Sequence, residues 1–235
     1  MAIRGILLDK DGTILDYWRT WVPVNREAAL YAARGDALLA AELLRLGGHS
    51  PETDRITPGA PLAAGDFMDI AHAFAAHPDV PPAEELVAGI ARIFVQGGAQ
   101  RSALIEGAEA ALLELQRRGF RLGIATNDSL AGTEASLAPH DNLPGFDFLA
   151  GADSGYGAKP GPGMVLAFCE ATRLAPPAVA VVGDAVHDLA MGRAAGVGLT
   201  VGVLSGTSGR ADLAALADVI VESIAELPTL PALYS

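Results

Sequence analysis

Residues 5–13 read Gly-Ile-Leu-Leu-Asp-Lys-Asp-Gly-Thr, a short apolar run that ends in two aspartates. Such a run, stopped by polar residues, is typical of a buried strand in a parallel sheet whose two faces are both covered. Asp9 and Asp11 are two residues apart, so in extended backbone their side chains point to the same side. Gly12 then permits a turn. The stretch predicts a strand with two carboxylates at its end.

Five more apolar runs follow along the chain and alternate with helical patterns. This alternation predicts an α/β fold, a doubly wound parallel sheet with helices on both faces. We expect the strands at residues 5–9, 121–125, 146–150, 179–183, 198–203 and 218–221. The connecting helices are expected at residues 108–118, 164–174 and 188–195.

Residues 16–99 interrupt the alternation and predict a second domain. They are rich in Ala and Leu, with helices expected at residues 24–46 and 83–95 around a Pro- and Gly-rich stretch. Residues 16–99 would therefore form a helical domain inserted after the first strand of a core made of residues 1–15 and 100–235. The Gly97-Gly98 pair is interpreted as a hinge that returns the chain to the sheet.

Composition restricts the class of protein. Of the 235 residues, 51% are hydrophobic and 19% are charged, which predicts a folded chain. The formal net charge of −12 opposes binding to nucleic acid or to an anionic membrane surface. No apolar run is long enough to cross a bilayer, and Cys169, the single cysteine, is expected in the core. We expect a cytoplasmic monomer or homodimer.

Polar residues directly after the strands are the first candidates for a site, because ligands of open parallel sheets bind beyond the carboxyl ends of the strands. Four clusters lie at or near such positions: Asp9 to Thr13, Thr126 to Asp128, Lys159-Pro160, and Gly183-Asp184 with Asp188. A pocket lined by Asp9, Asp184 and Asp188 would repel itself unless a hard divalent cation such as Mg²⁺ filled it. An acidic turn after a strand and a helix N-terminal acid are the structural alternatives.

The remaining polar residues suggest phosphate chemistry. Lysine occurs only at Lys10 and Lys159 among 16 basic residues, and a compact ammonium at Lys159 can approach both a carboxylate and a phosphoryl oxygen. An exposed loop lysine is the alternative there, and Lys10 is expected to face solvent. Thr126 offers a hydroxyl and Asn127 a backbone N–H, which can hold phosphoryl oxygens or cap a helix.

In this order, the clusters resemble the four motifs of the haloacid dehalogenase superfamily, in particular its phosphatases similar to phosphoglycolate phosphatase. The matching residues are Asp9 to Thr13 for the D-x-D-G-T signature, Thr126 for the second-motif hydroxyl, Lys159 for the third-motif lysine, and Gly183 to Asp188 for G-D-x-x-x-D. The resemblance covers residues 1–15 and 100–224. It implies a Rossmann-like core with a helical cap inserted after the first strand.

The resemblance also implies roles. Asp9 would be the nucleophile that forms an aspartyl phosphate, and Asp11 the general acid and then the general base. Thr126 and Asn127 would hold the phosphoryl group, and Lys159 would stabilise its charge. The substrate would be a small phosphorylated metabolite, with phosphoglycolate as a family-level guess.

For the metal, the resemblance implies that Mg²⁺ binds Asp9, Asp184 and the main-chain carbonyl of Asp11. Asp188 would bind a metal water or orient Lys159 from outside this shell. Asp11 also disfavours carbon–halogen cleavage, because dehalogenases of the family generally lack the second aspartate. A sugar-phosphate mutase, or an inactive binding protein on the same scaffold, remains as an alternative.

Several residues of the insertion have two interpretations. Trp18, Arg19 and Trp21 could contact the leaving group, or the two aromatic residues could pack at a hinge. Gly47-Gly48 could approach a substrate, although a helix terminator is the favoured reading.

Overall fold

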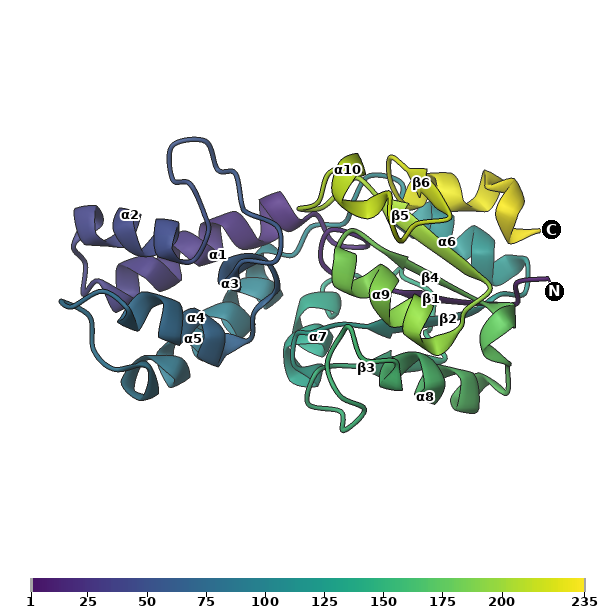
Figure 1. Ribbon diagram of the computed structural model, residues 1–235, viewed down its shortest axis with the longest axis horizontal. Coiled ribbons are helices and arrows are strands. Elements are labelled where there is room, and N and C mark those ends of the chain that lie inside the picture. The colour runs from purple at the N-terminus through teal and green to yellow at the C-terminus, as the bar shows by residue number, and fades with distance from the viewer. Residues whose placement is uncertain (1, 235) are drawn as a thin grey trace. The chain divides into compact units, whose positions relative to one another are not determined.

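The computed structural model describes residues 2–234 and contains a six-stranded parallel sheet in the order β3-β2-β1-β4-β5-β6 (Figure 1). The strands are β1 (Gly5–Leu8), β2 (Arg121–Ala125), β3 (Phe148–Ala150), β4 (Val179–Gly183), β5 (Leu199–Val203) and β6 (Val219–Val221). All six expected strands are present. Four of them, β1, β3, β5 and β6, are one or two residues shorter than expected.

The strand order confirms the doubly wound topology. From β1 the chain passes outward to β2 and β3, then returns to β4 on the other side of β1 and continues to β5 and β6. Leu8 lies opposite both Ile124 of β2 and Val182 of β4, so these three strands end nearly level. The residues that follow β1, β2 and β4 therefore emerge at one edge, where the direction of winding reverses and ligands bind in such sheets.

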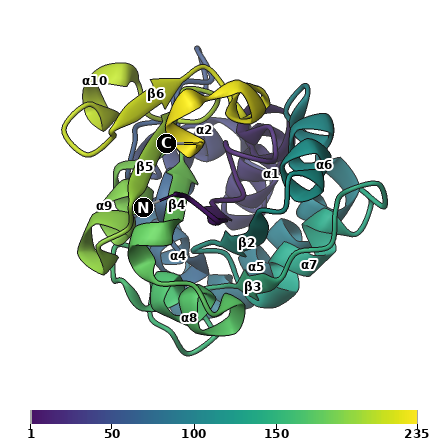
Figure 2. The same cartoon turned by 90° about the vertical axis from the view of Figure 1, so that its right-hand side faces the viewer.

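Helices cover both faces of this sheet (Figure 2). Helices α8 and α9 contact the strands and each other on one face, while α6 packs with the 3₁₀ turn η2 on the other. The elements are α6 (Ala108–Arg117), α7 (Leu130–Leu137), α8 (Gly163–Thr172), η1 (Pro176–Ala178), α9 (Val186–Ala195), α10 (Arg210–Leu213), η2 (Ile224–Thr229) and η3 (Pro231–Leu233). The three expected connecting helices are confirmed to within two residues at each end.

The core between α8, α9 and the sheet is apolar. Leu7, Val181, Met164 and Phe168 are buried in one cluster. Cys169 belongs to the same cluster, as expected, and burial raises the pKa of its thiol. This packing stabilises the positions of the strand ends.

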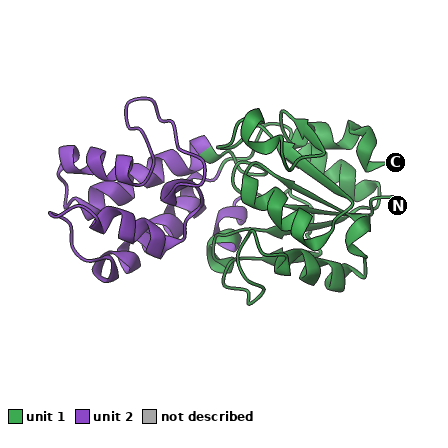
Figure 3. Cartoon of the chain, viewed as in Figure 1, with its two compact units in different colours: residues 1–17, 103–133, 140–235 green, residues 18–102, 134–139 purple. Residues whose placement is uncertain are grey.

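The chain divides into two compact units (Figure 3). Unit 1 comprises residues 1–17, 103–133 and 140–235, and unit 2 comprises residues 18–102 and 134–139. Most of unit 2 is thus inserted between β1 and β2. Its helices are α1 (Tyr17–Ala32), α2 (Ala37–Leu46), α3 (Pro61–Ala64), α4 (Phe67–Ala75) and α5 (Ala83–Arg101). Among the described residues, no helix has the length and apolar character that a membrane span requires.

The single helix expected at residues 24–46 was wrong. Helix α1 already begins at Tyr17, and the chain breaks after Ala32, where Arg34 (φ 51°) and Gly35 (φ 89°) adopt left-handed backbone. Glycine reaches this conformation without a steric penalty, so it ends helices readily. Asp36 then starts α2, because its side chain accepts the first backbone N–H groups of that helix.

The helix end expected at residue 95 was also wrong, because α5 continues through Gly97 and Gly98 to Arg101. Both glycines are buried within unit 2. A Cβ atom at Gly97 would lie 2.4 Å from Cγ2 of Val24, a fully buried residue of α1. Gly97 therefore allows α1 and α5 to approach closely.

We expect Gly97→Ala to destabilise unit 2 by about 1–3 kcal/mol, because overpacking against Val24 outweighs the better helix propensity of alanine. Gly89→Ala in the same helix is the matched control. A Cβ there would approach the outer ring atoms and hydroxyl of Tyr31, a partly exposed side chain that can move aside. Thermal unfolding of both variants checks this. A lower melting temperature for Gly89→Ala than for Gly97→Ala would contradict it.

Candidate active site

Asp9 lies at the centre of the sheet edge. It follows β1 directly, and its backbone N–H donates to the carbonyl of Val182 in β4 at 2.8 Å. The pairing of β1 with β4 therefore extends one residue beyond the strand and fixes the backbone of Asp9. The side chain is buried.

Lys159 joins two carboxylates. Its ammonium donates to Oδ1 of Asp9 at 2.6 Å and to Oδ1 of Asp188, on the first turn of α9, at 2.7 Å. Asp188 is held from its other side, because its Oδ2 accepts the backbone N–H of Ala185 at 2.9 Å. All three charged side chains are nearly inaccessible to solvent. The alternative of an exposed loop lysine is therefore wrong.

Asp184 follows β4 and is fixed by the loop after β5. Its Oδ2 accepts the backbone N–H of Thr207 at 2.8 Å. In the same loop the Ser205 hydroxyl donates to the carbonyl of Gly12 at 2.7 Å. A Cβ atom at Gly206 would lie 1.9 Å from Asp184 Oδ2, so glycine allows the loop backbone to cover this carboxylate. This loop was not among the predicted site residues, although its polar residues follow the end of a strand like those of the other clusters.

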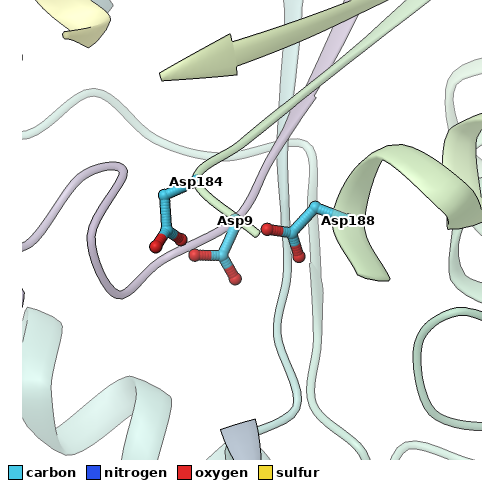
Figure 4. A group of neighbouring side chains, drawn as sticks. All are labelled: Asp9, Asp184 and Asp188. Atoms are coloured by element: carbon cyan, nitrogen blue, oxygen red, sulfur yellow. The ribbon is translucent and has the colours of Figure 1, made fainter. Parts of the chain in front are cut away.

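The three aspartates form a group that fits a cation. Oxygen atoms of Asp9, Asp184 and Asp188 lie within 4.8 Å of one another, and all three residues are buried. Figure 4 shows Asp9 between the other two. Carboxylate oxygens are the ligands that hard divalent cations prefer, and no soft sulfur or imidazole ligand belongs to the group.

The protonation of the group supports this fit. Burial raises the pKa of Asp9 to about 7, and the neighbouring Asp188 and Asp11 act in the same direction against the effect of Lys159. Burial also raises the pKa of Asp184 well above its ordinary value, with Asp9 and Asp188 contributing. For Asp188 burial opposes ionisation, but Lys159 holds the pKa below its ordinary value. A bound cation would favour ionisation of the whole group.

Thr126 and Asn127 lie at the end of β2, next to this group. The Thr126 hydroxyl accepts the backbone N–H of Asp128 at 3.1 Å. The Asn127 side chain accepts the backbone N–H of Lys159 at 2.9 Å, so it ties the lysine loop to the end of β2. The prediction for Asn127 included only its backbone N–H, because residue spacing carries no signal for a contact made by the side chain.

The expectation that Lys10 faces solvent was wrong. Its side chain is fully buried, and the ammonium lies 2.8 Å from Oδ2 of Asp11 and 3.0 Å from Oδ2 of Asp128. Lysine is rarely buried unless it is paired, and here two carboxylates supply the pairing. Asp11 itself is partly exposed. Both lysines of the chain are thus buried among aspartates of the site.

Two of the residues with open interpretations, Trp21 and Gly47, have defined surroundings in unit 2. Trp21 is buried and stacks on Phe94 with the ring centroids 5.7 Å apart, which favours packing for this residue. Gly47 is the C-cap of α2, which confirms the helix terminator. A substrate contact by Trp18 or Arg19 stays a prediction.

We expect Gly206→Ala to weaken binding of a divalent cation by at least about tenfold, because the new methyl group would displace the Asp184 carboxylate. Gly209→Ala in the same loop is the matched control, since the nearest atom to its Cβ, Oδ2 of Asp212, is 3.5 Å away. Titration calorimetry with Mg²⁺ measures both affinities, and thermal unfolding checks the fold. Equal affinities in the two variants would argue against Asp184 as a ligand.

Comparison with known proteins agrees with this arrangement. The family model for haloacid dehalogenase-like hydrolases matches residues 3–196. The N-acetylmuramic acid 6-phosphate phosphatase of Pseudomonas putida is 26% identical, with 83% of this chain and 81% of that protein covered. The phosphoglycolate phosphatase of Escherichia coli K12 is 29% identical, with 98% of this chain and 92% of that protein covered.

Solved structures show the same fold. A structure described as a predicted phosphoglycolate phosphatase from Haemophilus somnus superposes with a TM-score of 0.75 at 19% identity, covering 97% of each chain. CbbY from Rhodobacter sphaeroides in complex with phosphate gives a TM-score of 0.69 at 23% identity, covering 96% of each chain. The family match spans most of the sheet and the whole insertion. The chain therefore belongs to the haloacid dehalogenase-like hydrolases and is a phosphatase of that family.

Proposed function

We propose that the chain is a Mg²⁺-dependent phosphomonoester hydrolase that transfers the phosphoryl group of a small organic phosphate to Asp9 and then to water. The buried contact of Lys159 with both Asp9 and Asp188 carries this proposal. It holds a carboxylate and an ammonium side by side at the edge where strands β1, β2 and β4 end. A carboxylate nucleophile needs such a counter-charge, because an anionic phosphate repels it.

In the first step, a carboxylate oxygen of Asp9 attacks phosphorus and the bond from phosphorus to the ester oxygen breaks. The electron pair of that bond goes to the leaving oxygen, and Asp11 donates a proton to it, so an alcohol departs. In the second step, a water molecule attacks phosphorus and gives a proton to Asp11. The bond from phosphorus to Asp9 breaks, inorganic phosphate is released, and the carboxylate is restored.

Three further residues stabilise the charge in these steps. Lys159 would contact a phosphoryl oxygen while it remains beside Asp9, and Thr126 with the backbone N–H of Asn127 would hold the other oxygens. The bond from the Asn127 side chain to the Lys159 backbone supports this, because it couples the two loops that would hold the phosphoryl group. Asp188 would keep Lys159 in place.

The cation would be held by Asp9, Asp184 and the main-chain carbonyl of Asp11, with Asp188 outside this set. When bound, Mg²⁺ would neutralise charge on the phosphate and on the attacking carboxylate. The raised pKa of Asp9 and of Asp184 supports this, because both groups bind protons readily in the absence of a cation.

The descriptions of two relatives support a proposal for the substrate class. Phosphoglycolate and N-acetylmuramic acid 6-phosphate, named in the descriptions of two relatives, are both small phosphomonoesters. We propose a substrate of that class, with unit 2 acting as a cap that limits what can bind and excludes water. The insertion of unit 2 between β1 and β2 supports this role.

We expect Asp9→Asn to lower hydrolysis of every active phosphomonoester by at least about 10³-fold, because the amide is a poor nucleophile. Phosphate release is measured on a panel that includes phosphoglycolate and N-acetylmuramic acid 6-phosphate. Mass spectrometry of the acid-quenched wild-type enzyme should show one added phosphoryl group on Asp9. The exposed Asp141→Asn serves as control and should keep full activity. Unchanged hydrolysis in Asp9→Asn would rule out the covalent route, and isomerised sugar phosphate without phosphate release would indicate a mutase.

Removal of divalent cations should reduce the same activity to background, because the buried carboxylates would then repel the phosphate. The enzyme is treated with EDTA, desalted and assayed before and after addition of Mg²⁺. We expect recovery of at least about 90% of the activity of the untreated enzyme. Full activity after EDTA treatment would contradict the metal dependence and leave the covalent route to be judged by the Asp9 variant.

A further inference from the structure

The buried ion pairs of Lys10 are not explained by the roles described above. Lys10 lies between the two aspartates that follow β1, yet its ammonium is directed to Oδ2 of Asp11 and Oδ2 of Asp128, which comes from the end of β2. A buried ammonium is retained where carboxylates compensate its lost hydration. The side chain therefore joins the segments that follow β1 and β2, since Lys10 and Asp128 are 118 residues apart in sequence.

Asp128, the far end of this connection, is firmly held. Its Oδ1 accepts the backbone N–H of Ser129 at 2.7 Å, and its own N–H donates to the Thr126 hydroxyl at 3.1 Å. Its carbonyl accepts the N–H of Ala152 at 2.9 Å. A Cβ atom at Gly132 would lie 2.6 Å from Asp128 Oδ1, so the first turn of α7 packs closely on this carboxylate. Asp128 is thus an anchor for Lys10.

Asp11 differs, because its side chain is 21% exposed and lies on the turn after β1. The ion pair with Lys10 restricts the rotamers of this partly exposed carboxylate. A general acid must stay within hydrogen-bond reach of the oxygen that it protonates, and a small displacement costs a large part of the rate.

We propose that Lys10 is a positioning residue that fixes the Asp11 carboxyl group for proton transfer by tying it to the anchored Asp128. This inference rests on the proposed role of Asp11 as general acid. Lys10 itself touches neither phosphorus nor the leaving group. Loss of Lys10 should therefore impair the protonation of the leaving oxygen more than the attack of Asp9.

The leaving group distinguishes positioning from a general structural role. Phenyl phosphate releases a phenol of pKa about 10, which benefits from a proton donor, whereas 2,4-dinitrophenyl phosphate releases a stable anion that needs none. The value of kcat/KM covers only the steps through release of the phenol, so hydrolysis of the aspartyl phosphate does not affect the comparison.

We expect Lys10→Met to lower kcat/KM for phenyl phosphate by about 30-fold or more and for 2,4-dinitrophenyl phosphate by less than about threefold. In an Asp11→Asn background, the same change should alter the ratio of the two values by less than about twofold, because the two residues act as one unit. Arg121→Met is the control, since it removes an ion pair with Asp147 at the opposite end of β2 and should leave both values unchanged.

Asp128→Asn provides an independent measurement if Lys10→Met does not fold, as judged by thermal unfolding. This variant keeps Lys10 and Asp11 and removes only the charge that anchors Lys10. The ratio of kcat/KM for phenyl phosphate to kcat/KM for 2,4-dinitrophenyl phosphate should therefore fall, as in Lys10→Met, by at least about threefold. Equal losses for the two esters in the folded variants, or additive effects with Asp11→Asn, would overturn the positioning role while the phosphatase mechanism stands. A wild-type enzyme that hydrolyses neither ester nor any member of the panel would overturn the mechanism itself.

Discussion

Like charges crowd the edge where three strands of the sheet end, and the chain compensates them with its only two lysines. The carboxylates are Asp9, Asp11, Asp128, Asp184 and Asp188. Lys159 lies between two of them and Lys10 between two others, and both ammonium groups are buried. Burial disfavours ionisation of closely spaced acids, so the positions of the two lysines determine where negative charge is tolerated. The remaining repulsion favours binding of a cation to Asp9, Asp184 and Asp188.

Strand pairing in the sheet fixes the backbone that carries these crowded carboxylates. Because β1, β2 and β4 end nearly level, the aspartates are held by backbone that is already fixed by strand pairing. The loop after β5 adds a backbone N–H to Asp184 and approaches it closely through Gly206. Such preorganisation is what electrostatic catalysis requires, because groups already in place do not need to reorganise during the reaction.

The sequence predicted the sheet better than the insertion, for a physical reason. Parallel strands buried on both faces appear as short apolar runs bounded by turn residues, and all six were recognised. The helices of unit 2 depend on local features with weaker signals. The left-handed backbone at Arg34 and Gly35 divides the residues that the sequence predicted as one helix. Helix α5, in contrast, continues through Gly97 and Gly98, beyond its predicted end at residue 95. In α5, close packing against Val24 explains why a glycine stands at position 97, where residue type alone predicts the end of a helix.

The sequence by itself determined the fold class, the family resemblance and that Asp9, Asp184, Asp188 and Lys159 lie together, because the ends of parallel strands meet at one edge wherever the topology is doubly wound. Only the tertiary structure decided how these side chains are connected. The burial of Lys10 between Asp11 and Asp128, the bond from Asn127 to the Lys159 backbone and the cover of Asp184 by Thr207 all depend on neighbours from other segments. The partners of the last two contacts are 32 and 23 residues apart, and those of the Lys10–Asp128 contact 118. Residue type and local spacing carry no information about such neighbours, since burial and pairing are set by packing in three dimensions.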